Sequence, residues 1–285
     1  MSRRRAPSPL NLDTHLAYMI GVLYGDGHVR KNGSAFELNV GSESFAKCFH
    51  DAAVLAGFES RPIRPGQTHF EGKIFPTWTI TFYGQADVAQ LQDSFGPFDT
   101  FSWRVPRSLS AGTKEIQAAF LQGFCDSEGC VCLTEHVLAP TKTHPDPTLR
   151  RVGRPRPSIT IGSSNSAGLE DVLSMLEEFG LSGANMFFAP TRGQDYWSIH
   201  ICQLREIALF RTMIGFRIAE KMELLRSLNL EYQRNPWSPD EDARLLSLRQ
   251  DGCTYDAIAR RMGLTKAAVT HRYIRLCARR STSPA

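Results

Sequence analysis

The apolar positions of the chain form a pattern that occurs twice. Each copy opens with an apolar helical segment that ends in an acidic turn, LAYMIGVLYGDGHV at 16–29 and AFLQGFCDSEGCV at 119–131. Five positions match when one segment is laid over the other with an offset of 102: Ala17 and Ala119, Gly21 and Gly123, Gly25 and Ser127, Asp26 and Glu128, Gly27 and Gly129. Small residues at every fourth position form a groove on one helical face, so we expect the two helix backbones to pack closely.

The segments after these two helices repeat as well. Alternation predicts strands at 36–45 and 77–84 in the first copy and at 158–166 and 196–201 in the second. Apolar periodicity predicts a helix between the two strands of each copy, at 45–56 and at 169–179. Strict alternation indicates antiparallel sheets with one face against helices and one polar face open. The sequence therefore predicts an α+β fold of two halves, 10–112 and 113–233, each ordered helix, two strands, helix, strands, helix.

A third pattern begins beyond residues 231–235, which we interpret as a linker. Residues 236–280 hold three short helical segments separated by Asp251-Gly252 and by Gly263. Their apolar side chains are sufficient for a small core: Trp237, Leu245, Leu248, Tyr255, Ile258, Ala259, Val269, Tyr273 and Leu276. We expect a separate three-helix domain here.

Composition and charge add a partner to this picture. The chain has 285 residues, 42% hydrophobic and 22% charged, which is typical of globular domains and excludes a disordered chain. Its 33 basic residues, 26 Arg and 7 Lys, give a net charge of only +4, yet they gather in segments such as 142–156 and 260–285. Local basic clusters on a nearly neutral chain indicate a polyanion partner, and Arg suits phosphates and guanine edges.

The cysteines and the apolar runs bear on the compartment. Seven Cys without a CxxC pair predict no disulfide framework, and no run approaches the ~20 apolar residues of a membrane span. We therefore expect a cytoplasmic protein without a membrane partner. Cys130-Val-Cys132 with His136 and His144 is the nearest approach to a zinc pattern, but the same alternation fits a strand.

The acidic turns carry the candidate chemistry. Asp26 and Glu128 each fall at the C-terminal end of a helix, where the helix dipole disfavours a carboxylate. If the small-residue faces pack, the two carboxylates meet near a pseudo-twofold axis, an arrangement that a divalent cation between them would stabilise. Hard oxygen ligands suit Mg²⁺, which polarises a phosphodiester and activates water. The alternative is that each turn only ends its helix, and the matched pair favours the metal site.

The segments IGVLYGDG and QGFCDSEG resemble the two motif helices of single-chain LAGLIDADG homing endonucleases, and the resemblance covers residues 10–233. It implies two saddle-shaped αββαββα halves with the motif helices at their interface, and sheets that lie in the major groove of double-stranded DNA. The last acidic residue of each motif would bind Mg²⁺. This assigns the metal site to Asp26 and Glu128, with the preceding Gly25 and Ser127.

The same resemblance implies a polar strand residue and a basic residue near each acid. Asn39 and Thr160 occupy the strand position. Three residues in the segments WRVP and FRIAEK are candidates for the basic position: Arg104, Arg217 and Lys221. The family favours Lys there, so an Arg that contacts phosphate or only solvent is the alternative interpretation.

Candidate DNA contacts lie on the open sheet faces and on the last helix. By alternation the open faces present a mainly basic set: Arg30, Arg61, Arg64, Thr79, Arg154, Arg156, Arg192 and His200. Through YDAIA, AVTHRY and its spaced aromatics, the C-terminal segment resembles a Myb/SANT-type helix-turn-helix. Its third helix would enter the major groove with Lys266, Arg272 and Arg275. The alternative is a protein-contact module.

Together these features predict a monomeric, sequence-specific, Mg²⁺-dependent endonuclease that cuts both strands of a long, asymmetric DNA target. Two alternatives stay open: a non-catalytic transcriptional regulator in which a similar domain is joined to a helix-turn-helix, and an RNA splicing maturase. Regulators of this kind typically lose the metal-binding acids. This chain keeps both acids, which favours the nuclease.

Overall fold

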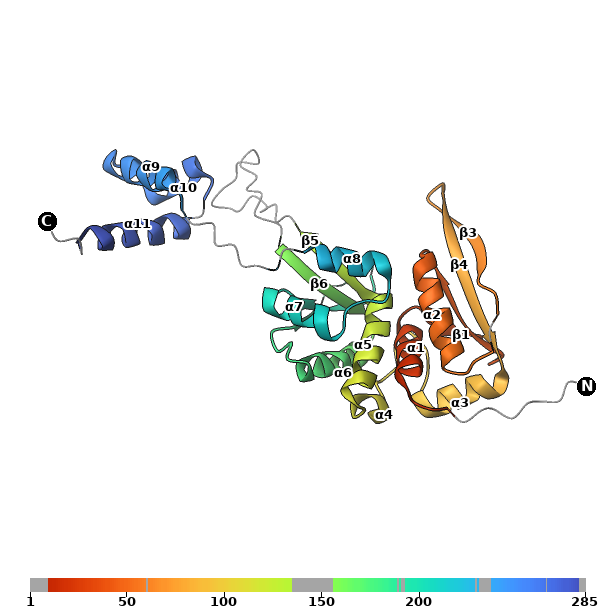
Figure 1. The fold of residues 1–285 in the computed structure, drawn as a ribbon. Helices are drawn as coiled ribbons and strands as arrows, with labels where there is room; N and C mark the ends of the chain where they lie inside the picture. The colour runs from red at the N-terminus through yellow and green to blue at the C-terminus, as the bar shows by residue number, and fades with distance from the viewer. Residues whose placement is uncertain are drawn as a thin grey trace, which may run out of the picture. The chain divides into compact units, whose positions relative to one another are not determined.

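The computed structural model describes residues 10–59, 61–134, 156–188, 190, 193–228, 230, 237–264 and 266–281. These residues form two compact units (Figure 1): the first takes in the described chain up to Thr134 and from Arg156 to Leu230, and the second begins at Trp237. The first unit contains two four-stranded antiparallel sheets together with helices, and the second is helical. The predicted α+β class is confirmed.

The first unit is built from two halves with the same order of elements. The first half contains α1 (Thr14–Gly25), β1 (Gly27–Val29), β2 (Ala35–Val40), α2 (Glu43–Leu55), β3 (Arg64–Phe70), β4 (Lys73–Tyr83) and α3 (Gln85–Phe95). After the short α4 (Arg107–Ser110), the second half contains α5 (Lys114–Glu128), β5 (Gly129–Thr134), β6 (Arg156–Ser163), α6 (Ser166–Glu178), β7 (Asn185–Phe188), β8 (Trp197–Ile201), α7 (Leu204–Met213) and α8 (Ala219–Ser227). Both halves run αββαββα, and their sheets have equivalent strand orders, β1-β2-β4-β3 and β5-β6-β8-β7.

The helices α1 and α5 lie side by side between the two halves (Figure 1). A Cβ atom on Gly21 would collide with the backbone oxygen of Phe120 and the backbone nitrogen of Phe124, and one on Gly123 would collide with the backbone of Tyr18. Only glycine permits this approach of two backbones. The predicted packing of the small-residue faces is confirmed.

Short polar side chains begin the helices. Asp13 caps α1 and Thr113 caps α5, each by accepting hydrogen bonds from backbone N–H groups of the first turn. The strands predicted to run into α2 and α6 end earlier, because Ser42 and Asn165 accept hydrogen bonds from the first turns of those helices. These caps turn the chain away from each sheet before the predicted strand ends.

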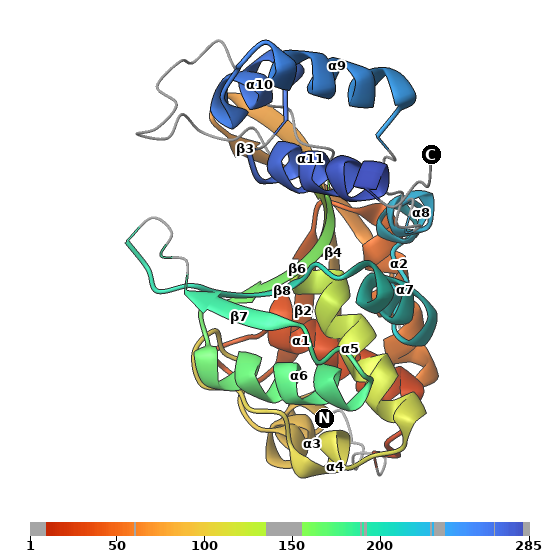
Figure 2. The same ribbon diagram turned by 90° about the vertical axis from the view of Figure 1, so that its left-hand side faces the viewer.

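Each sheet buries one face and leaves the other open. In β2, Leu38 is fully buried while its neighbour Asn39 is exposed, and in β6 Ile159 and Ile161 are fully buried. Figure 2 shows α6 lying along the buried face of the second sheet. The hairpin of β3 and β4 is longer than predicted, and every residue of β3 is exposed. The one-sided sheets inferred from alternation are confirmed.

The second unit is a three-helix structure of α9 (Pro239–Gln250), α10 (Tyr255–Met262) and α11 (Lys266–Ser281). Its core contains Leu245, Ile258, Ala259 and Val269, with the remaining predicted apolar residues packed around them. Gly263 ends α10 in the left-handed conformation, with φ of 67°. The predicted apolar set is confirmed, while the proposed linker 231–235 lies outside the described residues.

Two further features are the absence of a membrane-spanning helix from the described residues and the state of the cysteines. No helix within the described ranges is long and apolar enough to cross a membrane. The seven cysteines are free thiols. Cys130 and Cys132 lie on β5 with their Sγ atoms 3.7 Å apart, and the two other members of the zinc pattern, His136 and His144, lie outside the described residues.

Candidate metal and DNA-binding site

Asp26 and Glu128 lie together at the ends of the packed helices. Asp26 comes directly after the last residue of α1, and Glu128 is the last residue of α5. A Cβ atom on Gly25 would lie 3.2 Å from Cγ of Glu128 and would collide with Ser127, so the two helix ends are in direct contact. The packing of α1 on α5 therefore brings the two motif carboxylates to one place.

The electrostatics of this place are unfavourable for two carboxylates. Burial and the neighbouring charge of Asp26 raise the pKa of Glu128 to about 7. Burial of the carboxyl group also raises the pKa of Asp26, although the residue as a whole is exposed. The positive charge of Lys221 lowers both pKa values in part. Both acids are thus held where a further positive charge would stabilise their ionised forms.

The donor set fits a hard divalent cation. Two carboxylates and backbone carbonyl groups are oxygen ligands, and Mg²⁺ is usually held by one or two carboxylates with several waters. The Ser127 hydroxyl donates to the Val22 and Gly123 carbonyls, both at 3.4 Å, and Gly25 has no side chain, so Gly25 could contribute only backbone atoms. Within the described ranges no group of three or more His, Cys, Asp or Glu could hold a metal ion. Asp26 and Glu128 would therefore bind it together with water or phosphate.

A cavity of about 760 Å³ opens beside Asp26. Its lining includes Asn39, Trp78, Ser127 and Lys221. Gly27 of β1 pairs with Leu38 of β2, so the next residues along the two chains, Asp26 and Asn39, are neighbours. The Asn39 amide makes no hydrogen bond to any described residue. The structure thus brings Asn39 and Asp26 together, as the sequence predicts.

The predicted equivalence of Asn39 and Thr160 is wrong. In the second half β5 pairs with β6 so that Gly129 lies opposite Ile161, which makes Gly162 the strand neighbour of Glu128. Thr160 is on the same open face but lies two residues further along the strand. Alternation has a period of two, so the pattern identified the face correctly and could not fix the register.

The three candidates for the basic position differ in their surroundings. Lys221 is near the acids: its Nζ donates to the carbonyl oxygens of Asp126 and Gly129, both at 2.6 Å, at the end of α5. Arg217 is turned away: its guanidinium lies 3.9 Å from the centre of the Tyr18 ring. Of the three, Lys221 therefore has the position that the prediction requires, and its donors are directed at backbone carbonyls.

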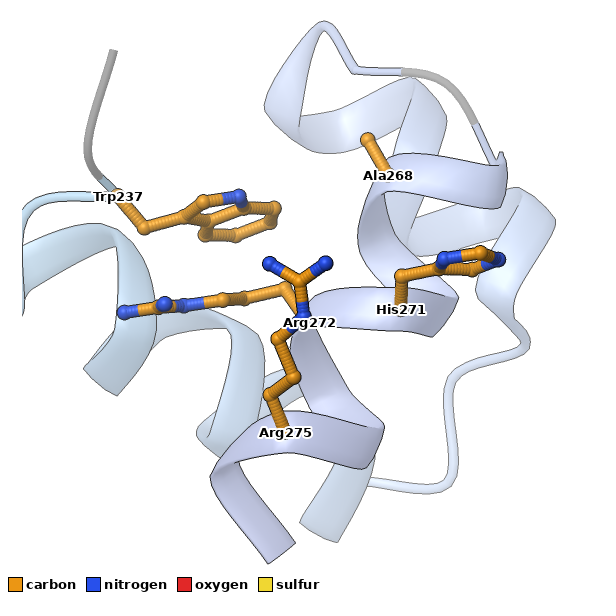
Figure 3. Close-up of a pocket in the computed structure, with 5 residues that line it drawn as sticks. All are labelled: Trp237, Ala268, His271, Arg272 and Arg275. Carbon is orange, nitrogen blue, oxygen red and sulfur yellow. The ribbon is translucent and has the colours of Figure 1, made fainter. Parts of the chain in front are cut away.

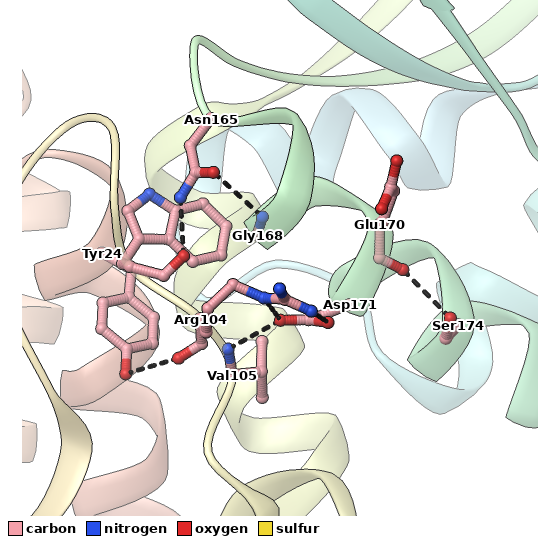
Figure 4. Close-up of polar contacts among 9 residues, drawn as sticks. Tyr24, Arg104, Val105, Asn165, Gly168, Glu170, Asp171 and Ser174 are labelled. Carbon is pink, nitrogen blue, oxygen red and sulfur yellow. Dashed lines mark hydrogen bonds and ion pairs between the residues drawn. The ribbon is translucent and has the colours of Figure 1, made fainter.

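Arg104 lies elsewhere. Its guanidinium forms a two-point ion pair with Asp171 of α6, with both N···O distances 2.6 Å, and Asp171 also accepts from the Val105 backbone N–H (Figure 4). The Arg104 carbonyl in turn accepts a hydrogen bond of 3.2 Å from the Tyr24 hydroxyl. Arg104 thus joins the segment after α3 to α6, and the structure does not bring it to the acids.

Asp126 is a site residue that the sequence interpretation missed. Its buried carboxylate accepts hydrogen bonds from the Tyr18 hydroxyl at 2.7 Å and from the backbone N–H groups of Arg217 and Ile218. Burial raises its pKa to about 6, and these hydrogen bonds oppose that shift. Asp126 therefore fastens the segment before α8 to α5 and so positions Lys221. The signal was a second acid two residues before Glu128 in the motif.

The open face of the first sheet carries the predicted basic residues. Arg64 lies opposite Thr79, which lies opposite Asn39, so a row of polar side chains runs across the sheet toward Asp26. Arg30 forms an ion pair of 2.9 Å with Glu37, and the guanidinium groups of Arg30 and Arg61 both lie over the Tyr83 ring: 5.1 and 5.5 Å from its centre. This face is polar, exposed and mainly positive, as a DNA-facing surface requires.

The open face of the second sheet is described in part. His200 lies opposite Thr160, and its Nε2 forms a hydrogen bond of 2.9 Å with the Ser198 hydroxyl. Arg154 and Arg192 lie outside the described residues, as does the side chain of Arg156 at the start of β6. Their roles as DNA contacts stay predictions.

The basic helix α11 of the second unit has fewer available charges than its sequence indicates. Arg272 is paired with Asp242, with Nε 2.7 Å from a carboxylate oxygen, and its guanidinium lies beneath the Trp237 ring (Figure 3). Lys266 pairs with Asp256 at 2.8 Å. Arg275 is exposed, and together with Trp237 and Arg272 it lines a groove of about 300 Å³. Arg272 therefore holds α11 to α9, and Arg275 is the better candidate for a phosphate contact.

The raised pKa of Glu128 predicts how stability depends on pH in the absence of metal. Because the folded protein binds a proton at Glu128 more tightly than the unfolded chain does, the contribution of this residue to stability is fully present at acidic pH and is lost as the pH rises to about 7. Glu128→Gln removes this loss, so at pH 8 we expect its free energy of unfolding to exceed that of the parent by about 1–3 kcal/mol. Denaturant unfolding in EDTA at pH 5 and pH 8 measures the difference, with Glu177→Gln, an exposed residue of α6, as control. An equal pH dependence in all three proteins would contradict the assignment.

Comparisons with known proteins give likeness of structure only. The chain matches no protein-family model and no curated protein. It is similar to the homing endonuclease I-WcaI bound to its DNA recognition sequence, at 12% identity and a TM-score of 0.48, over 76% of this chain and 88% of that one. It is also similar to full-length DUF199/WhiA from Thermatoga maritima, at 12% identity and a TM-score of 0.46, over 99% and 95% of the two chains. It is similar as well to I-DmoI in complex with DNA and Mn, at 16% identity and a TM-score of 0.43, over 72% of this chain and 98% of that one. Likenesses this low do not assign an activity, which has to be argued from the residues themselves.

Proposed function

We propose that the chain is a sequence-specific DNA endonuclease that depends on a divalent cation, with Mg²⁺ as the expected ion, as the LAGLIDADG resemblance implies. The proposal rests on one observation: Asp26 and Glu128 lie together at two helix ends, where burial disfavours the charge of both and the charge of Asp26 further disfavours that of Glu128. Such a pair lowers the stability of the protein unless a cation neutralises it. Two open polar sheet faces extend from the same place, which gives a duplex a surface to bind.

The chain's own residues prepare this site. Asp26 and Glu128 supply oxygen ligands, and Lys221, bonded to the carbonyls at the end of α5, favours their ionised forms. Asp126 holds the segment that carries Lys221 in place. A cation bound there would polarise a phosphodiester and lower the pKa of a bound water, which supplies the nucleophile. The Asn39 amide, which has no described hydrogen-bond partner, is available to a phosphate oxygen or a water beside Asp26.

Two halves with one acid each suit a duplex with two strands. The pseudo-twofold relation of α1 and α5 gives each strand an equivalent carboxylate, so both strands are cut. The open faces differ in sequence: the first carries Arg30, Arg61 and Arg64, and the second carries His200. Different faces imply an asymmetric target, and a single chain supplies both halves, which favours a monomer. Hydrogen bonds from the polar faces to base edges would read the sequence.

The second unit would serve as an accessory DNA-binding domain, as its Myb/SANT-like sequence implies. Arg275 is its exposed basic side chain beside Trp237. If it contacts a phosphate, Arg275→Gln in the full chain lowers the slope of log affinity against log salt by about 0.9. Binding of target DNA at several salt concentrations measures the slope, with Arg205→Gln, an exposed residue of α7, as control. An unchanged slope and affinity would make a protein partner the better proposal for this domain.

Cleavage of a randomised duplex library tests the proposed function. The full chain is incubated with the library and Mg²⁺, or with EDTA, and the cut ends are sequenced. We expect double-strand breaks at one long asymmetric site with Mg²⁺ and none with EDTA. Binding of one site without cleavage would contradict the nuclease and favour the non-catalytic regulator, and selective binding of RNA would favour the maturase.

A further inference from the structure

Glu128 has a strand neighbour without a side chain, in contrast to Asp26. The register that makes Asn39 the neighbour of Asp26 makes Gly162 the neighbour of Glu128. If the second half used the same arrangement as the first, a polar residue would stand at 162. The second half has to obtain a polar group from elsewhere, or work without one.

The glycine at 162 is not required by the backbone. It lies inside β6, it is not among the residues with positive φ, and glycine in a strand is unfavourable for stability. A Cβ atom at this position would collide with the hydroxyl and the ring of Tyr196. Gly162 therefore makes room for the Tyr196 hydroxyl, which fills the space that the Asn39 side chain fills in the first half.

The Tyr196 hydroxyl is placed to act on a bound molecule. Tyr196 directly precedes β8, its side chain is half-buried, and its hydroxyl makes no hydrogen bond to any residue in the described ranges. A tyrosine hydroxyl carries its proton at neutral pH and can donate it in a hydrogen bond. The Asn39 amide is likewise without a partner among the described residues. Each motif acid thus has one unused polar donor beside it.

We propose that Tyr196 is the counterpart of Asn39 in the second half, and that its hydroxyl donates a hydrogen bond to a phosphate oxygen of the DNA strand that is cut beside Glu128. This role rests on the proposed endonuclease function and adds a residue to it. Because each half serves one strand, the loss of either donor affects mainly one strand. The two strands of one duplex therefore provide an internal control for each variant.

The experiment measures cleavage of each strand of the target separately, using a duplex with a different label on each strand. Tyr196→Phe keeps the ring over Gly162 and removes only the hydroxyl. We expect it to slow cleavage of one strand by about 10- to 100-fold, the effect of one hydrogen bond to a charged group, and to change the other strand less than about twofold. Nicked DNA then accumulates. Asn39→Ala should produce the opposite nick.

A second variant transfers the arrangement of the first half to the second. Tyr196→Ala combined with Gly162→Asn places an amide beside Glu128, and we expect it to cut the affected strand faster than Tyr196→Ala with Gly162 unchanged. Equal slowing of both strands by Tyr196→Phe, or no slowing, would overturn the role of Tyr196. The parent protein is measured in the same assay. If it cuts neither strand, the endonuclease function itself is wrong, so the two failures are distinguishable.

Discussion

Asp26→Asn or Glu128→Gln should each lower the rate of DNA cleavage by about a thousandfold or more while leaving DNA affinity almost unchanged. Loss of a metal ligand removes several kcal/mol of transition-state stabilisation, and each 1.4 kcal/mol is a factor of ten in rate. The phosphate contacts that provide affinity lie on the sheet faces and remain intact. Cleavage and binding of the selected duplex, measured in the same buffer with Mg²⁺, give both quantities.

Glu177→Gln removes the same charge from an exposed position of α6 and should cut at the parent rate. Full cleavage by the Asp26 or the Glu128 variant would show that the paired carboxylates are not the catalytic site. A joint loss of cleavage and binding would instead indicate damage to the fold. The melting temperature of each variant separates these two outcomes.

Gly21→Leu or Gly123→Leu should lower the free energy of unfolding by about 3 kcal/mol or more, since an extra side chain must force the two helices apart. The obstacle at both positions is backbone, which cannot rotate away as a flexible side chain can. Even alanine at either position should cost about 1–3 kcal/mol. Because α1 and α5 also carry Asp26 and Glu128, the same substitutions should reduce cleavage. Denaturant unfolding measures the loss of stability.

Gly41→Ala is the matched control. The nearest atom to a Cβ at Gly41 is the Pro76 carbonyl oxygen at 4.0 Å, and its φ is not positive, so we expect a change within about 0.5 kcal/mol. If the Gly21 and Gly123 variants unfold at the same denaturant concentration as this control, the two helices do not touch through their backbones.

The sequence was most informative where a local rule repeats. The apolar segments with small residues at matched positions were sufficient to predict α1, α5 and their contact, because a small-residue face is defined within a few turns of one helix. Alternation identified the open face of each sheet for the same reason. It could not fix the register, so Thr160 was paired with Asn39 where the structure has Gly162.

Contacts between residues distant in sequence could not be predicted in this way. The basic residues of α11 were interpreted as free charges, whereas Arg272 is bound to Asp242 and Lys266 to Asp256. Tyr196 gives no signal of its own in the sequence, because only the folded sheet brings its hydroxyl over Gly162. Side chains that act through tertiary contacts are identified only once the chain is folded.

Binding of Mn²⁺ to the complex with a selected duplex tests whether Asp26 and Glu128 hold a divalent cation. The duplex is selected by binding alone, so the result does not depend on cleavage. Electron paramagnetic resonance then compares the parent with the double variant Asp26→Asn, Glu128→Gln at equal protein, DNA and Mn²⁺ concentrations. We expect the parent complex to bind Mn²⁺ that the double variant complex does not bind, and Mg²⁺ to compete for it. Equal binding by both complexes would mean that the two carboxylates are not a metal site.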